Sequence, residues 1–445
     1  MSGIAEVLFN LGYEVTGSDL RESETTRRLA GMGIKIRIGH REENLDSAHV
    51  VVVSSAVKQD NPEVEAARRL SVPVIPRAEM LAELARMKYG VLVAGAHGKT
   101  TTTSLISTVL GHGGLDPTII IGGKLKGIGS NAKLGQGDFL VAEADESDGS
   151  FLKLSPTIAV VTNIDREHMD FFKDMESLKE AFLSFINKVP FYGSAFICLE
   201  NRILRELMPR IHRRFLTYGL SDEADIRATG IVKAFMSTGF DVVYKGSGLG
   251  RFTVPAPGMH NVLNALACIG VALELKIDAE KIRESLQSFS GIQRRFELKG
   301  IAKGIRVYDD YGHHPTEVKA TIAAAVSNRP FLEKSSRLFV VFQPHRYTRT
   351  SDLMDEFASS FEGVDSLLVL DIYAAGEKPI EGVSSAALCD RIKKQCGVNV
   401  SYMSNREEAA ARLSSEMKDG DILLTLGAGD VWKLGEKVLE GLRAA

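Results

Sequence analysis

Apolar and polar positions in the first ninety residues alternate in a way that predicts helices and strands in turn. Apolar residues recur at helical spacing in three segments, and two shorter segments have strand character. The predicted elements are helices over 4–11, 22–31 and 78–87 and strands over 13–16 and 49–54. The second strand is a run of valines, which is typical of a parallel strand covered on both faces.

The same alternation continues to the end of the chain, and we place domain boundaries near 88 and near 291. Between these points we predict strands over 90–94, 139–143, 157–162 and 195–198 and helices over 99–110, 175–187 and 260–275. We also predict an antiparallel patch over 226–254 with turns around Gly239 and Gly246–Gly250. Later strands are predicted over 338–342, 366–370 and 422–426. The pattern therefore predicts three α/β domains, over 1–87, 88–290 and 291–445.

Composition narrows the class of protein. Of 445 residues, 44% are hydrophobic and 25% are charged, which excludes an intrinsically disordered chain. The net charge of −3 argues against a dedicated nucleic-acid binder. The four cysteines are far apart, so we expect free thiols in a reducing compartment. No apolar run of about 18 residues and no secretion signal occur, so we expect a cytoplasmic protein without membrane insertion.

The strongest chemical signal is a glycine-rich turn between a predicted strand and a predicted helix. It consists of Gly95, Ala96, His97, Gly98, Lys99, Thr100 and Thr101. Such a turn directs backbone N–H groups at phosphate oxygens, Lys99 would reach the β- and γ-phosphates, and Thr100 would bind Mg²⁺. Position 93 is valine, so this loop is shorter than the usual GxxxxGK[ST] pattern. The alternative is a chance occurrence of Gly-Lys-Thr.

Acidic groups follow two of the predicted strands. Glu143 ends the strand over 139–143, where a carboxylate beside a phosphate loop is suited to a divalent cation. His168 lies in the segment after the strand over 157–162 and could approach the same point. The alternatives are a solvated acidic turn and a loop histidine that binds nothing.

Polar pairs mark the start of the helix over 260–275 and the entry to the third domain. Asn261 and Asn264 share one helical face and suit hydrogen bonds to a base or a phosphate. The alternative is that Asn261 caps the helix and Asn264 is exposed. Arg294 and Arg295 could face developing phosphoryl charge or could be solvated surface.

Two segments of the third domain, 309–317 and 343–349, each follow an apolar strand. His313 and His314 beside acids could suggest zinc, although no HExxH spacing occurs. Arg346 and Arg349 are three apart at a predicted helix start and could hold a carboxylate.

Taken together, the motifs resemble those of the Mur ligases of peptidoglycan synthesis. They occur in order as MSGIAE, GSD, SSAV, GAHGKTTT, EADESDGSF, TNIDREHMD, HNVLNALA, RRFE, DDYGHHPTE, FQPHRYTR and LGAGD. The resemblance implies a Rossmann-like N-terminal domain for a UDP-sugar, a central P-loop ATPase-like domain, and a Rossmann-like C-terminal domain that helps bind ATP and an amino acid.

Within that family the motifs are most similar to those of the branch that joins L-alanine to UDP-N-acetylmuramate. The resemblance implies a reaction with ATP and Mg²⁺ through an acyl phosphate, with ADP and phosphate as products. A ligase that recycles murein tripeptide uses the same scaffold and is the nearest alternative. A catalytically silent nucleotide-binding module is the alternative from another class.

The resemblance also implies individual roles. Lys99 would hold the β- and γ-phosphates, Thr100 and Glu143 a first Mg²⁺, and His168 a second. The remaining implied roles are nucleotide contact for Asn261 and Asn264, γ-phosphate contact for Arg295, ribose binding for Asp310, and lining of the alanine end for Tyr311, His313, Arg346 and Arg349.

The N-terminus departs from the family pattern. Residues 1–6 already resemble the start of a helix, whereas such a domain begins with a strand and a glycine-rich turn, of which only Gly3 is present. We therefore expect roughly a dozen residues to be missing, from a late start site or a trimmed form. Affinity for the UDP-sugar would fall, while nucleotide binding would persist.

Overall fold

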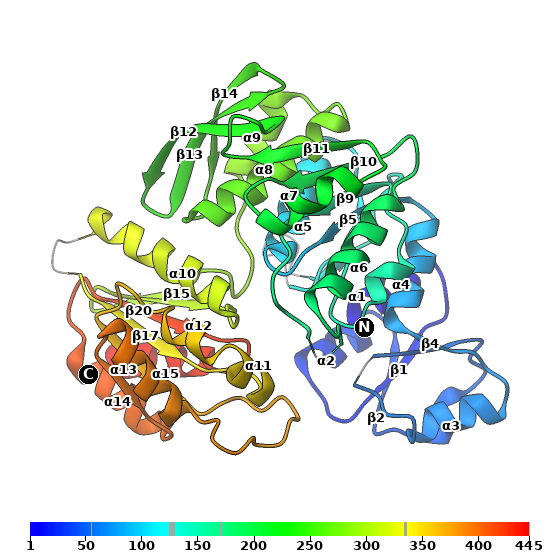
Figure 1. Ribbon diagram of the computed structural model, residues 1–445. Helices are drawn as coiled ribbons and strands as arrows, with labels where there is room; N and C mark the ends of the chain where they lie inside the picture. The colour runs from blue at the N-terminus through cyan, green and yellow to red at the C-terminus, as the bar shows by residue number, and fades with distance from the viewer. Residues whose placement is uncertain (55, 124–129, 170, 333–335, 445) are drawn as a thin grey trace. The chain divides into compact units, whose positions relative to one another are not determined.

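The computed structural model (Figure 1) describes residues 1–54, 56–123, 130–169, 171–332 and 336–444. Ser55 and Asp170, which fall within two of the motifs quoted above, lie outside the described residues. The chain forms two compact units. The first unit comprises Met1–Thr229, Asp241–Gly250 and Leu263–Phe289, and the second comprises Gly230–Phe240, Arg251–Val262 and Ser290–Ala445. The three expected domain boundaries stay predictions.

The N-terminal part of the first unit contains two small parallel sheets of two strands each. Its elements are α1 (Ser2–Asn10), β1 (Thr16–Asp19), α2 (Glu24–Gly31), β2 (Lys35–Ile38), the 3₁₀ turn η1 (Glu42–Leu45), β3 (Val51–Val53), α3 (Pro62–Arg69), β4 (Val74–Pro76) and α4 (Arg77–Arg86). Strand β1 pairs with β2, and β3 pairs with β4. Ser23 caps α2, and Asn61 caps α3 directly before Pro62, which suits the first helical position.

Two expectations for this region are wrong. The strand predicted over 13–16 lies further along the chain, because β1 begins at Thr16. The valine run does form β3, which pairs in parallel with β4, but its residues are only partly buried. Each strand of a two-stranded sheet is an edge strand. Strand β2 (KIRI) and helix α3 (PEVEAARR) were not predicted, since their polar residues obscure the apolar pattern.

A larger sheet forms the centre of the first unit. Its strands are β5 (Tyr89–Ala94), β6 (Thr118–Ile120), β7 (Ala132–Lys133), β8 (Phe139–Glu143), β9 (Ile158–Val161), β10 (Ser194–Cys198) and β11 (Phe215–Gly219). The spatial order is β11-β10-β9-β5-β8-β6-β7, with only β7 antiparallel among these seven strands. Val93 lies opposite Glu143 and Ala94 opposite Val161, so β5, β8 and β9 end level with one another. The loops that follow these strands therefore meet at one edge.

Helices flank this sheet. The apolar periodicity predicted three of them, which are α5 (Lys99–His112), α6 (Met175–Asn187) and α8 (Met259–Glu274). It did not predict α7 (Arg202–Leu207) and α9 (Ala279–Gln287), or the short 3₁₀ turns η2 (Ser150–Lys153) and η3 (Met208–Arg210). Helix α5 contacts β5, β8 and α9. Its residues Leu105, Ile106 and Val109 are fully buried, and each such side chain stabilises the fold by roughly 1.5–3 kcal/mol.

The predicted patch over 226–254 consists of three long strands, β12 (Ile226–Ala234), β13 (Ser237–Tyr244) and β14 (Ser247–Val254). The turn expected around Gly239 lies slightly earlier in the chain, between β12 and β13, with Met236 at a φ of 54°. Gly239 itself lies inside β13. A Cβ at position 239 would lie 2.9 Å from an Arg251 nitrogen, so this glycine makes room for a side chain. The turn expected at Gly246 is confirmed, with a φ of 81°.

The second unit contains a six-stranded sheet. Its strands are β15 (Glu297–Ala302), β16 (Ile305–Asp310), β17 (Leu338–Phe342), β18 (Ser366–Val369), β19 (Val400–Tyr402) and β20 (Ile422–Leu426). The order is β15-β16-β20-β17-β18-β19, and only β15 is antiparallel. Leu426 lies opposite both Asp310 and Phe342, so the carboxyl ends of β16, β20 and β17 are level.

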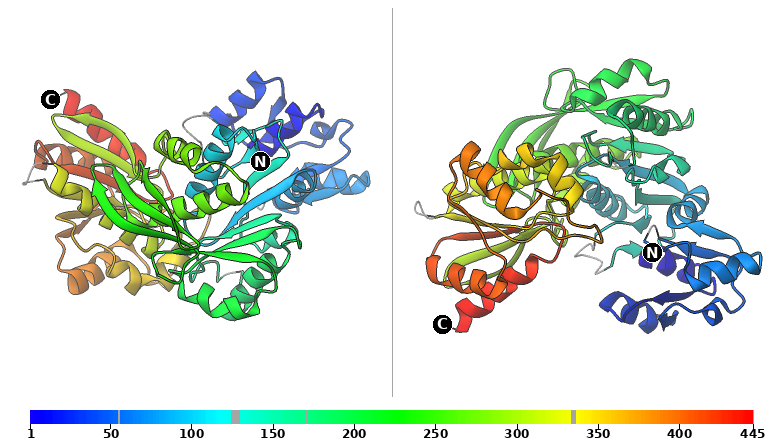
Figure 2. Two further views of the ribbon diagram at one scale, coloured as in Figure 1. Left: turned by 90° about the horizontal axis from the view of Figure 1, so that it is seen from above. Right: turned by 60° about the horizontal axis from the view of Figure 1, so that its bottom comes forward.

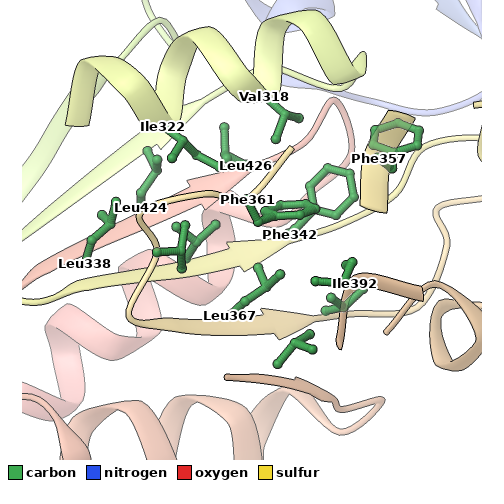
Figure 3. Packing of buried hydrophobic residues seen from close by; sticks show 14 of the residues in the cluster. Val318, Ile322, Leu338, Phe342, Phe357, Phe361, Leu367, Ile392, Leu424 and Leu426 are labelled. Carbon is green, nitrogen blue, oxygen red and sulfur yellow. The ribbon is translucent and has the colours of Figure 1, made fainter. Parts of the chain in front are cut away.

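Helices cover both faces of this sheet, which can be followed in Figure 2. They are α10 (Pro315–Asn328), α11 (Tyr347–Asp352), α12 (Met354–Ala358), α13 (Ser385–Cys396), α14 (Arg406–Glu416) and α15 (Trp432–Ala444), with the 3₁₀ turn η4 (Arg329–Phe331). Phe342 packs with Phe357 and Ile392 on one face (Figure 3), while Phe339 packs with Leu434 on the other. Because β17 is buried on both faces, its uninterrupted apolar run was a reliable strand signal.

Candidate active site

The glycine-rich turn joins the end of β5 to the start of α5, as the sequence predicts. Gly95 has a φ of +132° and Gly98 a φ of +84°. A Cβ on Gly95 would lie 2.1 Å from Thr162 Oγ1, and one on Gly98 would lie 2.7 Å from Asn264 Oδ1. Only glycine fits such conformations and contacts. The turn therefore depends on glycine at both positions, and it leads into the N-terminus of α5, where backbone N–H groups suit an anion.

The loop after β9 holds this turn in shape. Thr162 Oγ1 and the Asn163 amide both donate to the carbonyl of His97, at 2.6 and 3.0 Å. Asn163 also accepts from the His97 N–H at 2.9 Å, and its carbonyl accepts from the Ala96 N–H. The His97 ring lies 2.9 Å from a carboxylate oxygen of Asp165. Hydrogen bonds from the loop after β9 thus fix the conformation of the glycine-rich turn.

Lys99 is engaged by a carboxylate that was not among the predicted site residues. Its ammonium donates to the Gly95 carbonyl at 2.6 Å and to both oxygens of Glu146, at 2.7 and 2.9 Å. The Glu146 residue is only 1% exposed. Burial raises the pKa of Glu146 in spite of the neighbouring Lys99 charge. Burial opposes a raised pKa for Lys99, but the nearby carboxylates, Glu146 first, outweigh it.

Three side chains near this lysine have the chemistry of a cation site. Ligand atoms of Glu146, Glu167 and His168 all lie within 4.8 Å of one another. Two carboxylates and an imidazole suit a divalent cation such as Mg²⁺ or Mn²⁺. The structure therefore groups His168, which was predicted as a cation ligand, with two acids that were not predicted, Glu146 and Glu167. Glu143 ends β8 as predicted, and its carboxylate accepts from the Gly122 N–H at 2.8 Å.

The two predicted asparagines have different surroundings. Asn264 is buried and accepts from Thr102 Oγ1 at 3.1 Å, next to Gly98 in the first unit. Asn261 is also buried, and its amide donates to the Pro257 carbonyl within the second unit. The interpretation of Asn264 as an exposed residue is therefore wrong.

Thr101 is half-buried in the first turn of α5.

In the second unit, the adjacent Arg294 and Arg295 have separate tasks. Arg294 donates to Asp309 at 2.9 Å and to the carbonyls of Gly427 and Gly429 at 2.6 and 3.0 Å. These bonds tie the entry segment to the loop after β20. Arg294 is thus a structural residue rather than solvated surface.

Arg295 is the less constrained member of the pair. Its guanidinium lies 3.7 Å from Glu317 and 5.5 Å from the centre of the Tyr311 ring. The side chain keeps 28% exposure. Arg295 therefore stays partly exposed beside Glu317, and its predicted contact with the γ-phosphate stays a prediction.

Asp310, the predicted ribose ligand, is held by donors of its own unit. One carboxylate oxygen accepts from the Phe296 N–H at 2.7 Å, and the other accepts from the Gly312 N–H at 2.8 Å and from Thr321 at 3.2 Å. Burial raises its pKa to about 6, against the lowering effect of the Arg295 charge. These contacts fix the loop after β16, and ribose binding stays a prediction.

A row of rings lies at the carboxyl edge of the second sheet. His313 is 5.3 Å from Tyr311 and 5.7 Å from His345, and His345 stacks on Tyr373 at 5.5 Å. Burial lowers the pKa of His313 to about 3. Arg349 lies beside this row, with a nitrogen 3.2 Å from His345 Nδ1.

The remaining predicted residues of this edge serve different ends. Arg346 is the N-cap residue of α11, with a φ of 70°, and its guanidinium lies 3.9 Å from a carboxylate oxygen of Glu377. His314 caps α10 by accepting from the Thr316 N–H, whereas His313 directs Nδ1 at the Tyr311 carbonyl. The adjacent histidines therefore have separate partners, and the described residues do not group the two as a pair of metal ligands.

Four side chains that contribute to these clusters were not among the predicted site residues. They are Glu146, Glu167, His345 and Tyr373. The first three lie inside motifs quoted from the sequence. Those motifs marked the segments, but they did not indicate which acid or ring in each segment would lie in the site. Tyr373 lies just after β18, and only its position beyond a strand end could have suggested it.

Among the residues that the structure describes, no helix is both long enough and apolar enough to cross a lipid bilayer.

Models of known families match nearly the whole chain. The Mur ligase family catalytic-domain model matches residues 1–89, the Mur ligase middle-domain model matches 93–272, and the Mur ligase glutamate-ligase-domain model matches 294–429.

Individual relatives agree with these matches. The chain is 57% identical over 446 aligned residues to the UDP-N-acetylmuramate–L-alanine ligase of Geobacter sulfurreducens, covering 100% of this chain and 96% of that protein. It is 54% identical to the ligase of the same name from Desulfatibacillum aliphaticivorans, covering 99% and 95%. The solved UDP-N-acetylmuramate–alanine ligase of Thermotoga maritima superposes with a TM-score of 0.84 at 27% identity, covering 100% and 96%. The chain belongs to the Mur ligase family, with its three-domain α/β architecture.

Proposed function

We propose that this chain is an ATP-dependent ligase that joins L-alanine to UDP-N-acetylmuramate in peptidoglycan synthesis. The observation that carries the proposal is the 57% identity along the entire chain to a UDP-N-acetylmuramate–L-alanine ligase. The ordered phosphate loop at the start of α5 supports the use of a nucleoside triphosphate.

The proposed reaction has two steps. A lactyl carboxylate oxygen of UDP-N-acetylmuramate attacks the γ-phosphorus of ATP, the bond to the β-phosphate oxygen breaks, and ADP leaves. The alanine amine then attacks the carbonyl carbon of the resulting acyl phosphate. Phosphate leaves with the bonding electrons, and the nitrogen loses a proton. The products are UDP-N-acetylmuramoyl-L-alanine, ADP and phosphate.

The nucleotide would be held by several of the predicted site residues. In the proposal, residues 95–101 cradle the phosphates, Lys99 offsets charge on the β- and γ-phosphates, and Arg295 faces the transferred group. The ordering of the turn by the loop after β9 supports the first of these roles. Asn261, Asn264 and Asp310 are proposed to contact the nucleoside.

The residues present fit a divalent cation. Thr100 and Glu143 would hold one Mg²⁺, and His168 would hold a second. Bound Mg²⁺ would neutralise charge when a carboxylate approaches a triphosphate. Oxygen donors dominate these positions, and the grouping of Glu146 and Glu167 with His168 supports the placement of positive charge there.

The amino acid would bind at the carboxyl edge of the second sheet. Arg346 and Arg349 are proposed to hold its carboxylate, and Tyr311 and His313 to line its amine end. His313 Nδ1 lies 3.1 Å from the Tyr311 carbonyl, which only accepts, so Nδ1 carries the proton. The neutral ring then offers Nε2 as an acceptor for the amine.

A product assay tests the proposal. We expect ADP release only when UDP-N-acetylmuramate and an amino acid are both present, with L-alanine preferred in a panel that includes glycine, L-serine and a murein tripeptide. Preference for the tripeptide would identify a recycling ligase instead. Nucleotide binding without ADP release would identify a silent binding module.

A further inference from the structure

The proposed function places Glu146 near a cation but gives no reason for its contact with the phosphate-loop lysine. The four acids of 143–148 have partners of their own, which are the Gly122 N–H for Glu143, Arg77 for Asp145, Lys99 for Glu146 and the Ser150 N–H for Asp148. Glu146 alone among them is nearly inaccessible, with 1% exposure, and alone binds the phosphate-loop lysine.

The contacts of Lys99 leave no proton for a further acceptor. An ammonium has three donors. Here they are shared among both oxygens of Glu146, the Gly95 carbonyl at 2.6 Å and the Ala96 carbonyl at 3.4 Å. A phosphate oxygen can bind Lys99 only when one of these acceptors releases it. The carboxylate, with two oxygens within 2.9 Å, occupies the ammonium as a phosphate group would.

The backbone that carries Glu146 is held beside the loop. The Glu146 carbonyl accepts from the Gly149 N–H at 2.9 Å, and the Asp145 carbonyl accepts from the Phe151 N–H at 3.1 Å. Phe151 is fully buried, which anchors the segment further. A carboxylate released from Lys99 therefore stays close to the phosphate loop, and its charge would repel a bound phosphate unless a cation offsets it.

The surroundings offer a place for such a cation. Glu146 lies 3.8 Å from His168 Nε2, and both belong to the group that Glu167 completes. The same carboxylate can thus be a partner of Lys99 or a ligand of a divalent cation.

From these contacts we propose that Glu146 competes with the nucleotide phosphates for Lys99, and that a divalent cation relieves this competition by drawing the carboxylate toward itself. The inference rests on the proposed role of Lys99 in phosphate binding. Glu146 is a positioning residue that acts through Lys99, and it couples nucleotide affinity to the cation. Linkage then requires that nucleotide and cation strengthen the binding of each other.

The test is ADP binding to the full chain by isothermal titration calorimetry, once with EDTA and once with Mg²⁺. Glu146→Gln keeps the shape and one acceptor but removes the competing charge. We expect it to bind metal-free ADP about tenfold more tightly than wild type, and to gain less from Mg²⁺. A purely structural ion pair predicts the opposite sign, because loss of one partner would weaken the loop.

Glu79→Gln is the matched control. Glu79 forms an exposed Lys–Glu pair with Lys153 at 2.7 Å, so the substitution removes the same charge from the same kind of pair outside the site. It should leave both ADP affinities unchanged. If Glu146→Gln does not fold, Glu146→Asp is measured in its place. Its shorter side chain reaches Lys99 less well, so it should also bind metal-free ADP more tightly than wild type.

Equal or weaker metal-free ADP binding in the decisive Glu146 variant, with Lys99→Ala still weakening ADP binding, would overturn the inference alone. If Lys99→Ala binds ADP as wild type does in both conditions, the proposed role of Lys99 fails, and the inference fails with it. Tighter metal-free binding in the Glu146 variant but not in Glu79→Gln supports the inference.

Discussion

The phosphate loop of the first unit and the ring cluster of the second unit are built on the same principle of level strand ends but with opposite electrostatics. Around the loop, charges are present and paired, as in the contact of Lys99 with Glu146 at 2.7 Å. In the ring cluster, burial suppresses charge, and it lowers the pKa of His313 to about 3 and that of His345 to about 4.

The difference indicates how each region responds to a ligand. A paired charge must exchange its partner when an anion arrives, so the first region should depend on cations and ionic conditions. A neutral ring row keeps its hydrogen-bond geometry across the neutral pH range, so the second region should depend on shape and on its arginines. Four predictions test this contrast.

The largest effect is expected at the phosphate loop. Lys99→Ala should lower kcat by at least about a hundredfold, roughly 2.7 kcal/mol of barrier, because the lysine offsets charge during phosphoryl transfer. The measurement is steady-state ADP release, with circular dichroism to confirm folding. A folded variant that keeps more than about a tenth of wild-type kcat would refute the assignment of Lys99.

The next effect concerns the arginines of the second unit. Arg349→Lys keeps the charge but removes the planar fork, so the KM for L-alanine should rise about 10–100-fold while the KM for ATP changes little. Initial rates over a range of alanine concentrations provide the measurement. An unchanged alanine KM, or an equal rise for ATP, would remove Arg349 from the amino-acid site.

The third prediction concerns pH and stability. His313 binds a proton near pH 6.5 when unfolded but only near pH 3 when folded. The contribution of neutral His313 to the free energy of unfolding is present in full above pH 6.5. It is lost as the pH falls toward 3, by up to about 1.4 kcal/mol per pH unit. Urea unfolding at pH 7 and pH 5 should show a smaller loss in His313→Gln than in wild type. The exposed His212→Gln is the control, and equal losses in all three proteins would contradict the prediction.

The smallest effect concerns the cation. Glu143→Gln and His168→Ala should each raise the Mg²⁺ concentration for half-maximal activity, by roughly three- to tenfold, because each removes one of several proposed ligands. Activity titrated with Mg²⁺ at saturating ATP gives the comparison. Arg349→Lys serves as a control from the other region, and its Mg²⁺ requirement should stay at the wild-type value. Superimposable titrations for all variants would exclude both residues from cation binding.

Local features of the fold could be predicted from the sequence because their causes are local. Gly95 and Gly98 signal a turn since no other residue fits their conformations, and the apolar runs of β8 and β17 signal strands since both faces are buried. The order of the motifs along the chain was sufficient to identify the family.

Which side chains meet was decided only by the tertiary structure. Strand β5 lies between β8 and β9, an order that the chain sequence does not state, and this order brings the loop with Glu146 to Lys99. Likewise, Arg294 and Arg295 are neighbours in sequence, but their contacts differ. Arg294 donates to the loop after β20, whereas Arg295 lies beside Glu317.

The sequence by itself thus determined the fold class, the phosphate loop and the family of this protein. Glycine conformation, apolar periodicity and motif order are properties of contiguous residues. Only the tertiary structure decided that Glu146 faces Lys99, that His313 is neutral, and that His314 caps a helix. Pairing and burial depend on which strands and loops become neighbours, and that choice is made by packing of the whole unit.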